Sequence, residues 1–269
     1  KEGEKIFEAH LLMKKKHIIV ATPGRLIVYI NEKKIKLGEV KLLVFDESDQ
    51  MFDNGFYDDC AYIRSRVAMH SQIILSSATI SDRVEEFIKN EIDDYELLKI
   101  GLNIPKNIVQ ERIDCKISAK NKLLLKILSQ KKFDRVLIFT NKKPRTYSIS
   151  DFLIKNKYNS KPINSDFEQS ERENHLKLFK DGSVKILVAT DVAARGLHID
   201  NVDIVINYDV PNRAEFYVHR IGRTGRLDKE GYALTMVCPE DDDRFHHIEF
   251  DYNIKVDYLE LNNNNNNNN

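Results

Sequence analysis

Residues 41–49 read Lys-Leu-Leu-Val-Phe-Asp-Glu-Ser-Asp, and this stretch decides the fold class. Four apolar residues in a row are typical of a strand that is buried on both faces, and the acids mark where that strand ends. Such strands occur in parallel sheets covered by helices, and ligands bind beyond the carboxyl ends of the strands. The stretch therefore predicts an α/β protein with acidic side chains at the ligand-binding edge of a sheet.

The same alternation of apolar runs and helical segments occurs twice along the chain. In the first half, strands are predicted at 17–21, 41–46, 72–77 and 96–100, and helices at 24–30, 56–69 and 82–91. In the second half, strands are predicted at 135–140, 184–190, 203–208 and 232–238, and helices at 120–130, 144–156, 169–180, 213–221 and 240–249. The pattern is interrupted by Gly-Leu-Asn-Ile-Pro-Lys-Asn at 101–107. We therefore predict a first domain at 1–100, a linker at 101–109, a second domain at 110–261 and a disordered tail of asparagines at 262–269.

Composition restricts the class of protein. The chain is 42% hydrophobic and 31% charged, as in soluble globular proteins. Its formal net charge is zero, so a nucleic-acid partner would have to be held by a local basic surface. Cys60, Cys115 and Cys238 lack paired metal spacing and fit a reducing compartment. No apolar stretch is long enough for a membrane span and no secretory leader follows Lys1, so we expect an intracellular protein, cytoplasmic or nuclear, without a membrane partner.

A basic motif points to phosphate chemistry. Residues 219–226 read His-Arg-Ile-Gly-Arg-Thr-Gly-Arg. The arginine fork fits phosphate oxygens, and glycines let the backbone approach a ligand closely. Arginine brought to a transferring phosphoryl group is a catalytic device. The alternative is a solvated basic helix end.

The acids after the strand at 41–46 suit a magnesium nucleotide. Asp46 could hold Mg²⁺ through water, and Glu47 could orient or deprotonate an attacking water. Acids that match the dipole of a helix start are the alternative. Ser77 and Thr79 follow the next strand and could hydrogen-bond the acids, although small polar residues are common in such loops.

Three further segments suit nucleic-acid or nucleotide contacts. Thr-Pro-Gly-Arg at 22–25 reads as a helix start that could bind an anion, or as a plain capped helix. Residues 189–196 follow a strand and could contact a phosphate or a ribose, or could form only a short capped helix. Gln169 and Arg172 lie three residues apart on a predicted helix and so face the same way, which an exposed polar face would also explain.

Taken together, these motifs strongly resemble those of the DEAD-box RNA helicases of superfamily 2, over about residues 10–250. The resemblance rests on 21–25, 44–49, 77–79, 137–141, 169–172, 189–196 and 219–226. It implies two RecA-like parallel-sheet domains, of which the first would be incomplete here. It also implies ATP and Mg²⁺ as cofactors, single-stranded or duplex RNA as a partner, and room for protein cofactors.

The resemblance also implies residue roles. Asp46 would hold Mg²⁺ through water and Glu47 the hydrolytic water, while Arg223 and Arg226 would reach the γ-phosphate. His219 would contact the acidic motif, and Asp191 and Gly196 would contact the nucleotide. Ser77, Thr79 and Asp49 would couple hydrolysis to strand separation. RNA would be bound by Thr22, Pro23, Gly24, Arg25, Thr140, Gln169, Arg172 and Thr190.

The chain departs from the family pattern in four places. It contains no G-x-x-x-x-G-K-[ST] phosphate loop and no upstream adenine-reading glutamine motif, so we expect this chain alone to hydrolyse ATP negligibly. Ser48 replaces an alanine, His198 stands where many relatives carry an aspartate, and 162–166 lacks the usual His-Gly-Asp. The alternative to an RNA helicase is therefore a catalytically inactive fragment that binds RNA or a protein. A DNA-directed helicase and a structural α/β protein are less favoured, because both the 22–25 and 219–226 motifs fit the RNA family.

Overall fold

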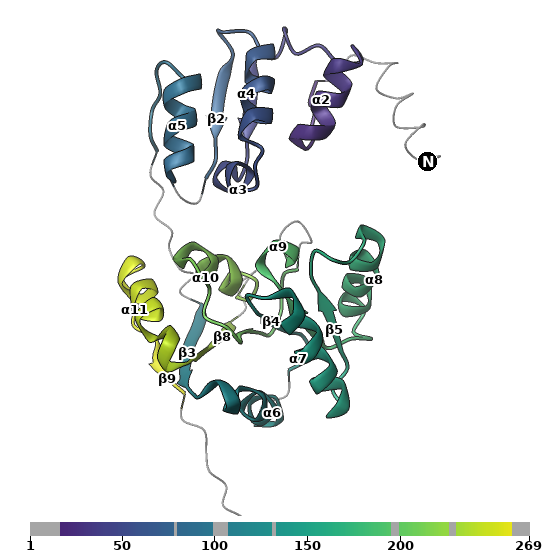
Figure 1. Cartoon of the computed structure of the whole chain (residues 1–269), viewed down its shortest axis with the longest axis vertical. Helices are drawn as coiled ribbons and strands as arrows, with labels where there is room; N and C mark the ends of the chain where they lie inside the picture. Colours follow the sequence, from purple (N-terminus) through teal and green to yellow (C-terminus); the bar gives the residue numbers. More distant parts are fainter. Residues whose placement is uncertain are drawn as a thin grey trace, which may run out of the picture. The chain divides into compact units, whose positions relative to one another are not determined.

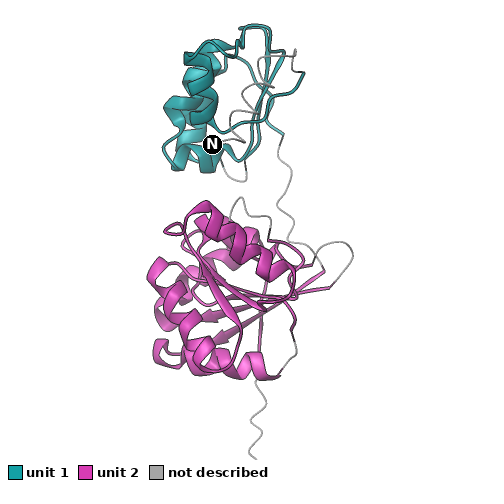
Figure 2. Cartoon of the chain, turned by 90° about the vertical axis from the view of Figure 1, so that its right-hand side faces the viewer, with its two compact units in different colours: residues 1–100 teal, residues 101–269 magenta. Residues whose placement is uncertain are grey.

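The structure is a computed structural model, and it describes residues 17–77, 80–98, 107–130, 133–194, 199–225 and 230–259. The chain divides after Ile100 into two compact units, coloured separately in Figure 2. Both units contain parallel strands with helices packed against them (Figure 1), which confirms the α/β prediction. Ile108 and Val109, which the sequence placed in the linker, already belong to a strand of the second unit. No helix in the described ranges is long and apolar enough to cross a membrane.

Unit 1 (1–100) has helices on one side of a small parallel sheet (Figure 2). In its described part, the strands are β1 (Leu42–Phe45) and β2 (Gln72–Leu75), and the helices are α2 (Pro23–Asn31), α3 (Ser48–Asp53), α4 (Tyr57–Arg66) and α5 (Asp82–Glu91). Because side chains alternate along a strand, Leu43 and Phe45 pack against the helices. Leu42 and Val44 lie on the other face and are 49% and 50% exposed.

An aromatic cluster joins the strands and helices of unit 1. The rings of Phe52 and Phe87 stack with centroids 4.7 Å apart, and Phe45 and Tyr57 each meet Phe87 edge-on at 5.5 Å. These residues come from β1, α3, α4 and α5. The cluster therefore fixes the end of β1, where the acidic residues follow.

The strands predicted at 17–21 and 96–100 are wrong where the structure describes them. Residues 18–22 form no strand, and Ile18 and Val20 are 82% and 91% exposed. Residues 94–98 form no strand either, and 99–100 lie outside the described residues. An apolar run becomes a strand only when a neighbour satisfies its backbone hydrogen bonds. Helix α3 was not predicted, because six residues are too few to establish a helical period.

Unit 2 (101–269) contains a seven-stranded parallel sheet in the order β5-β6-β4-β7-β8-β3-β9. The strands are β3 (Ile108–Asp114), β4 (Val136–Phe139), β5 (Ser160–Ile163), β6 (Ile186–Ala189), β7 (Ile204–Asn207), β8 (Gly231–Val237) and β9 (Asp257–Tyr258). The helices are α6 (Lys120–Gln130), α7 (Lys143–Lys155), α8 (Gln169–Lys180), α9 (Asp191–Ala194), α10 (Ala214–Ile221) and α11 (Asp242–Asp251). Every residue of β4, β6 and β7 is buried, as in strands covered on both faces.

The predicted strands and helices of the second half are confirmed to within a few residues. β3, β5 and β9 were not predicted. They carry charged residues or proline and lie toward the two edges of the sheet, where burial does not impose an apolar run.

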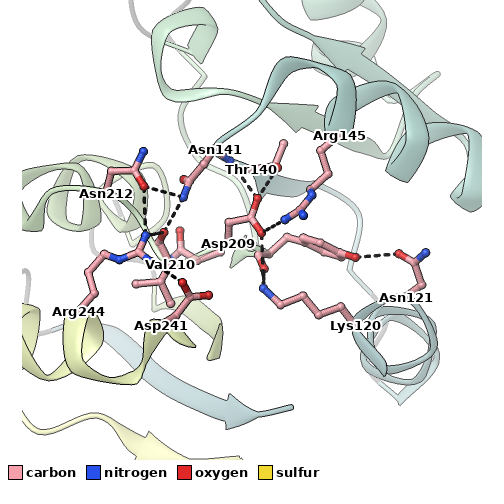
Figure 3. Close-up of polar contacts among 12 residues, drawn as sticks. Lys120, Asn121, Thr140, Asn141, Arg145, Asp209, Val210, Asn212, Asp241 and Arg244 are labelled. Carbon is pink, nitrogen blue, oxygen red and sulfur yellow. Dashed lines mark hydrogen bonds and ion pairs between the residues drawn. The ribbon is translucent and has the colours of Figure 1, made fainter. Parts of the chain in front are cut away.

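A buried carboxylate, Asp209, joins the carboxyl ends of β4 and β7 to α6 and α7 (Figure 3). Its Oδ2 accepts hydrogen bonds from Thr140 Oγ1 at 2.5 Å and from the backbone N–H of Asn141 at 3.1 Å. Its Oδ1 pairs with Arg145 and lies 3.5 Å from Lys120 Nζ. Burial alone would raise the pKa of the Asp209 carboxyl, but the two hydrogen bonds and the two cations outweigh burial and hold that pKa below its usual value.

Two glycines let three backbone segments of unit 2 touch. Gly225 follows α10 and has a φ of +66°, and a Cβ there would lie 2.6 Å from Cγ1 of Ile108. A Cβ on Gly231, the first residue of β8, would lie 2.3 Å from the backbone nitrogen of Gly225. The start of β3, the start of β8 and the turn after α10 therefore pack with no room for a side chain at either glycine.

We expect Gly231→Ala to lower the free energy of unfolding of unit 2 by about 1–3 kcal/mol, because a rotamer change cannot relieve a clash with backbone. Gly222→Ala is the milder comparison and should cost less, since among the described residues the nearest atom to a Cβ there is the Val218 carbonyl oxygen at 3.1 Å, against 2.3 Å at Gly231, and its φ of −63° suits any residue. Urea unfolding followed by circular dichroism compares the two variants. Equal stability would contradict the close approach of the three segments.

We expect Asp209→Asn to lower stability at pH 7 and to flatten its acid dependence. A carboxyl whose pKa is depressed in the folded state stabilises the protein above the unfolded-state pKa of about 3.9, and this stabilisation is lost as the pH falls through the lower, folded-state pKa. The stability difference between wild type and variant should therefore shrink below about pH 4. Urea titrations at pH 7, 4 and 3 measure it, with Asp251→Asn on the surface as the control. A difference that is independent of pH would contradict the assignment.

Candidate functional site

The acidic motif of unit 1 begins where β1 ends. Asp46 and Glu47 are exposed, whereas Ser48 and Asp49 are buried at the start of α3. Glu47 has a left-handed backbone, with φ 53° and ψ 46°, which is costly for a residue other than glycine and is typical of functional positions. This conformation turns the chain sharply, so that the two exposed carboxylates stand directly at the carboxyl end of the strand.

The segment after β2 is tied to the acidic motif. Both the backbone N–H and the hydroxyl of Ser48 donate to the carbonyl oxygen of Ser76, at 2.9 and 3.1 Å, and Ser76 N–H donates to the Phe45 carbonyl at 2.9 Å. The structure thus brings the end of β2 beside the acidic motif, and the coupling role of Ser77, the next residue, stays a prediction. Thr79 lies outside the described residues.

Asp46 fits a hydrated magnesium ion better than a fully caged one. One oxygen of its exposed carboxylate accepts the backbone N–H of Glu47 at 3.1 Å. Among the described residues, no group of three His, Cys, Asp or Glu side chains could hold a metal. Mg²⁺ commonly takes one or two carboxylates and completes its shell with water and substrate phosphate.

The predicted RNA contacts of unit 1 lie at the start of α2. Thr22 is the residue before the helix, but its side chain makes no capping hydrogen bond. Arg25 donates to the hydroxyl of Tyr29 at 3.0 Å. Among the described residues, the nearest atom to a Cβ on Gly24 would be Asp59 Oδ2 at 4.0 Å, so their packing does not require glycine there. Pro23 is the first residue of the helix.

In unit 2 the arginine motif divides into two environments. Arg220, in the last turn of α10, is 1% exposed. It binds Asp191 through two hydrogen bonds of 2.6 and 2.7 Å and also donates to the Asp209 carbonyl at 2.7 Å and to Asn141 Oδ1 at 2.8 Å. These contacts join α10 to the ends of β4, β6 and β7. Arg220 therefore holds the unit together, a role that the sequence pattern did not distinguish.

Arg223, three residues later, is held loosely. Its side chain is 21% exposed and donates from Nε to the His219 carbonyl at 3.2 Å and from Nη1 to Asp200 at 3.3 Å. Asp200 was not among the predicted site residues. The available signal was an acidic residue in the connection between β6 and β7, which could pair with an arginine of the 219–226 motif. Arg226 lies outside the described residues.

Three predicted RNA contacts of unit 2, Gln169, Arg172 and Thr190, lie at α8 and directly before the start of α9. Arg172 donates from Nη2 to the Ala193 carbonyl at 3.0 Å and from Nη1 to Gln169 Oε1 at 3.1 Å. Nε of Arg172 and Oγ1 of Thr190 are buried, and neither has a hydrogen-bond partner among the described residues. An unpaired buried donor costs about 1–3 kcal/mol, so both groups are candidates for a partner outside the described residues.

Two predicted residues have internal partners instead. Both carboxylate oxygens of Asp191 accept hydrogen bonds from Arg220, and the hydroxyl of the fully buried Thr140 donates to Asp209. Their contacts to nucleotide and to RNA remain predictions. Gly196 lies outside the described residues. Asp209 itself was missed, although it directly follows a predicted strand.

Comparison with known proteins places this geometry in a family. The family model described as DEAD/DEAH box helicase matches residues 2–87, and that described as helicase conserved C-terminal domain matches 119–228. The DEAD-box ATP-dependent RNA helicase CshA of Geobacillus kaustophilus is 39% identical over 241 residues, which cover 88% of this chain and 51% of CshA. The chain thus spans about half the length of this curated relative.

Solved structures give the same result. The DEAD box protein from Methanococcus jannaschii is 33% identical with a TM-score of 0.57, and the match covers 92% of this chain and 68% of that one. S. cerevisiae Dbp5 bound to RNA and ADP BeF3 is 28% identical with a TM-score of 0.79, over 91% of this chain and 67% of Dbp5. Motifs, parallel-sheet folds and relatives agree, and the chain belongs to the DEAD-box family of ATP-dependent RNA helicases.

Proposed function

We propose that the protein carrying this chain couples ATP hydrolysis to RNA binding, and thereby unwinds short duplexes or remodels ribonucleoprotein. The observation that carries the proposal is that two arginines of one motif differ in burial and in number of hydrogen-bond partners. Arg220 is buried and bound by several acceptors, whereas Arg223 is partly exposed and contacts one carboxylate. A guanidinium held this loosely is available to a nucleotide phosphate.

Each unit contributes its own chemistry in this proposal. Asp46 would hold Mg²⁺ through water, and the chemistry that the ion would supply is charge neutralisation at the phosphates. Glu47 orients the attacking water and accepts its proton. Arg223 and Arg226 donate hydrogen bonds to the charge that develops on the transferred phosphoryl group, and His219 keeps the coupling role that the resemblance implies.

RNA binding rests on the unpaired donors of Thr190 and Arg172, with Gln169 and residues 22–25 as further contacts. Phosphate oxygens would supply the acceptors that these donors lack, and phosphate contacts do not read base sequence. Dbp5, whose structure resembles this chain, was solved with RNA and a nucleotide analogue, which supports both ligands. The proposal also includes protein cofactors as partners. It places the protein in a reducing intracellular compartment, which suits its three free cysteines.

We expect Arg223→Ala to lower kcat for ATP by about 100-fold or more at saturating RNA, because the arginine acts mainly in the transition state. Its RNA affinity should stay nearly unchanged. Arg213→Ala, at the exposed start of α10, is the control and should keep normal kcat. Steady-state ATPase assays and RNA titrations separate the two effects, and Glu47→Gln should abolish turnover. If the wild-type protein binds RNA without RNA-stimulated hydrolysis, the alternative of a non-catalytic RNA-binding protein is correct.

We expect Thr190→Val to weaken RNA binding about 5–10-fold without lowering stability, because its buried hydroxyl has no partner within the described structure to lose. Thr224→Val is the matched control. The hydroxyl of Thr224 is also buried, but it donates to the Val202 carbonyl at 2.6 Å, so this variant should lose about 1 kcal/mol of stability and keep its RNA affinity. RNA titrations at two salt concentrations and urea unfolding measure both properties. Unchanged RNA affinity in Thr190→Val would remove Thr190 from the RNA site.

A further inference from the structure

The first described residues of unit 2 contact the turn that carries Arg223. The side-chain N–H of Asn107 donates to the carbonyl oxygen of Gly225, and the backbone carbonyl of Asn107 accepts the N–H of Gly231 at 2.8 Å. Asn107 directly precedes β3 and thus lies where the chain enters the sheet of unit 2. It bonds both to the turn after α10 and to the start of β8.

Packing leaves this contact little freedom. Cγ1 of Ile108 would lie 2.6 Å from a Cβ on Gly225, and a Cβ on Gly231 would lie 2.3 Å from the backbone nitrogen of Gly225. Asn107 and Ile108 therefore support Gly225 by a hydrogen bond and by direct contact. A shift of the start of β3 would shift the turn with it.

The turn sets the direction of Arg223, because the side chain of Arg223 has weak contacts of its own. Asp200 is 3.3 Å away, and the other contact, from Nε to the His219 carbonyl at 3.2 Å, is made within the same chain segment and moves with the turn. The backbone is held more firmly, since Val202 N–H donates to the Arg223 carbonyl at 3.3 Å and Thr224 Oγ1 donates to the Val202 carbonyl at 2.6 Å. Those bonds join the turn to the segment before β7, and the Asn107 bond joins it to the segment before β3.

We propose that Asn107 is a positioning residue for Arg223: through the Gly225 carbonyl it fixes the turn that aims the arginine. The inference rests on the proposed function, because Arg223 must act on the nucleotide for its aim to matter. The inference also makes the aim of Arg223 depend on how the chain enters unit 2.

Asn107→Asp tests the inference, because it keeps the shape of the side chain and removes the N–H that Gly225 accepts. Asn159→Asp is the matched control: Asn159 also donates a side-chain N–H to a loop carbonyl of unit 2, that of Ser183, next to strands on the opposite side of the sheet. Urea unfolding of both variants shows whether each lost bond costs similar stability.

The first readout is amide hydrogen exchange in the chain itself, over a peptide spanning residues 218–225. The amides of Arg223 and Thr224 donate to the carbonyls of Arg220 and Ile221 at 3.1 and 3.0 Å, so they report opening of the turn. We expect exchange about 5-fold faster in Asn107→Asp, the factor for a lost hydrogen bond worth about 1 kcal/mol, and unchanged in Asn159→Asp. Unchanged exchange in Asn107→Asp, or equal acceleration in both variants, would overturn the inference.

The second readout is RNA-stimulated ATPase of the protein carrying this chain. We expect Asn107→Asp to lower kcat about 10-fold, with RNA affinity and KM for ATP nearly unchanged, and Asn159→Asp to match the wild type. If the wild type is active and Asn107→Asp keeps a normal kcat, the positioning role of Asn107 is wrong, while the proposed function stands. A wild type without RNA-stimulated ATPase would overturn the proposed function and this role with it.

Discussion

The guanidinium of Arg220 is the contact on which unit 2 depends. The Arg220 side chain is 1% exposed. Its N–H groups donate to Asn141, Asp191 and the Asp209 carbonyl, which follow β4, β6 and β7. A buried charge is tolerated only when it is paired and hydrogen-bonded, so these strand ends must keep their positions relative to α10. The same strand ends carry Thr190, Asp191 and Asp209. One side chain therefore fixes both the scaffold of unit 2 and the edge of the sheet at which we propose that ligands bind.

Hydrogen-bond saturation separates scaffold residues from residues available to ligands. Arg220 and Asp209 have several partners each, and Arg223 has weak ones. Thr190 has a buried hydroxyl without a partner among the described residues. Residue type does not make this distinction, because Arg220 and Arg223 are chemically identical and lie three positions apart. The distinction comes from burial and from the acceptors that the fold places nearby.

The fold class, most elements of unit 2 and the two main motifs were predictable from sequence, because apolar runs such as 184–190 must be buried on both faces of a parallel sheet. The prediction failed where partners decide the outcome. Residues 17–21 are as apolar as β1, yet they form no strand in the described structure. Likewise, the pairing of Asp191 with Arg220, and of Asp200 with Arg223, joins residues more than twenty positions apart. Only the packing of β6, β7 and α10 brings these residues together.

The left-handed backbone of Glu47 has a consequence for how this sequence balances stability against activity. A glycine would adopt φ 53° without strain, whereas a side chain there costs about 1 kcal/mol or more. Glycine would therefore give unit 1 a more stable turn but would remove the carboxylate to which we assign the attacking water. Screens that select variants for thermal tolerance alone should favour replacement at this position. At position 47, the residue best suited to folding differs from the residue that the proposed chemistry requires.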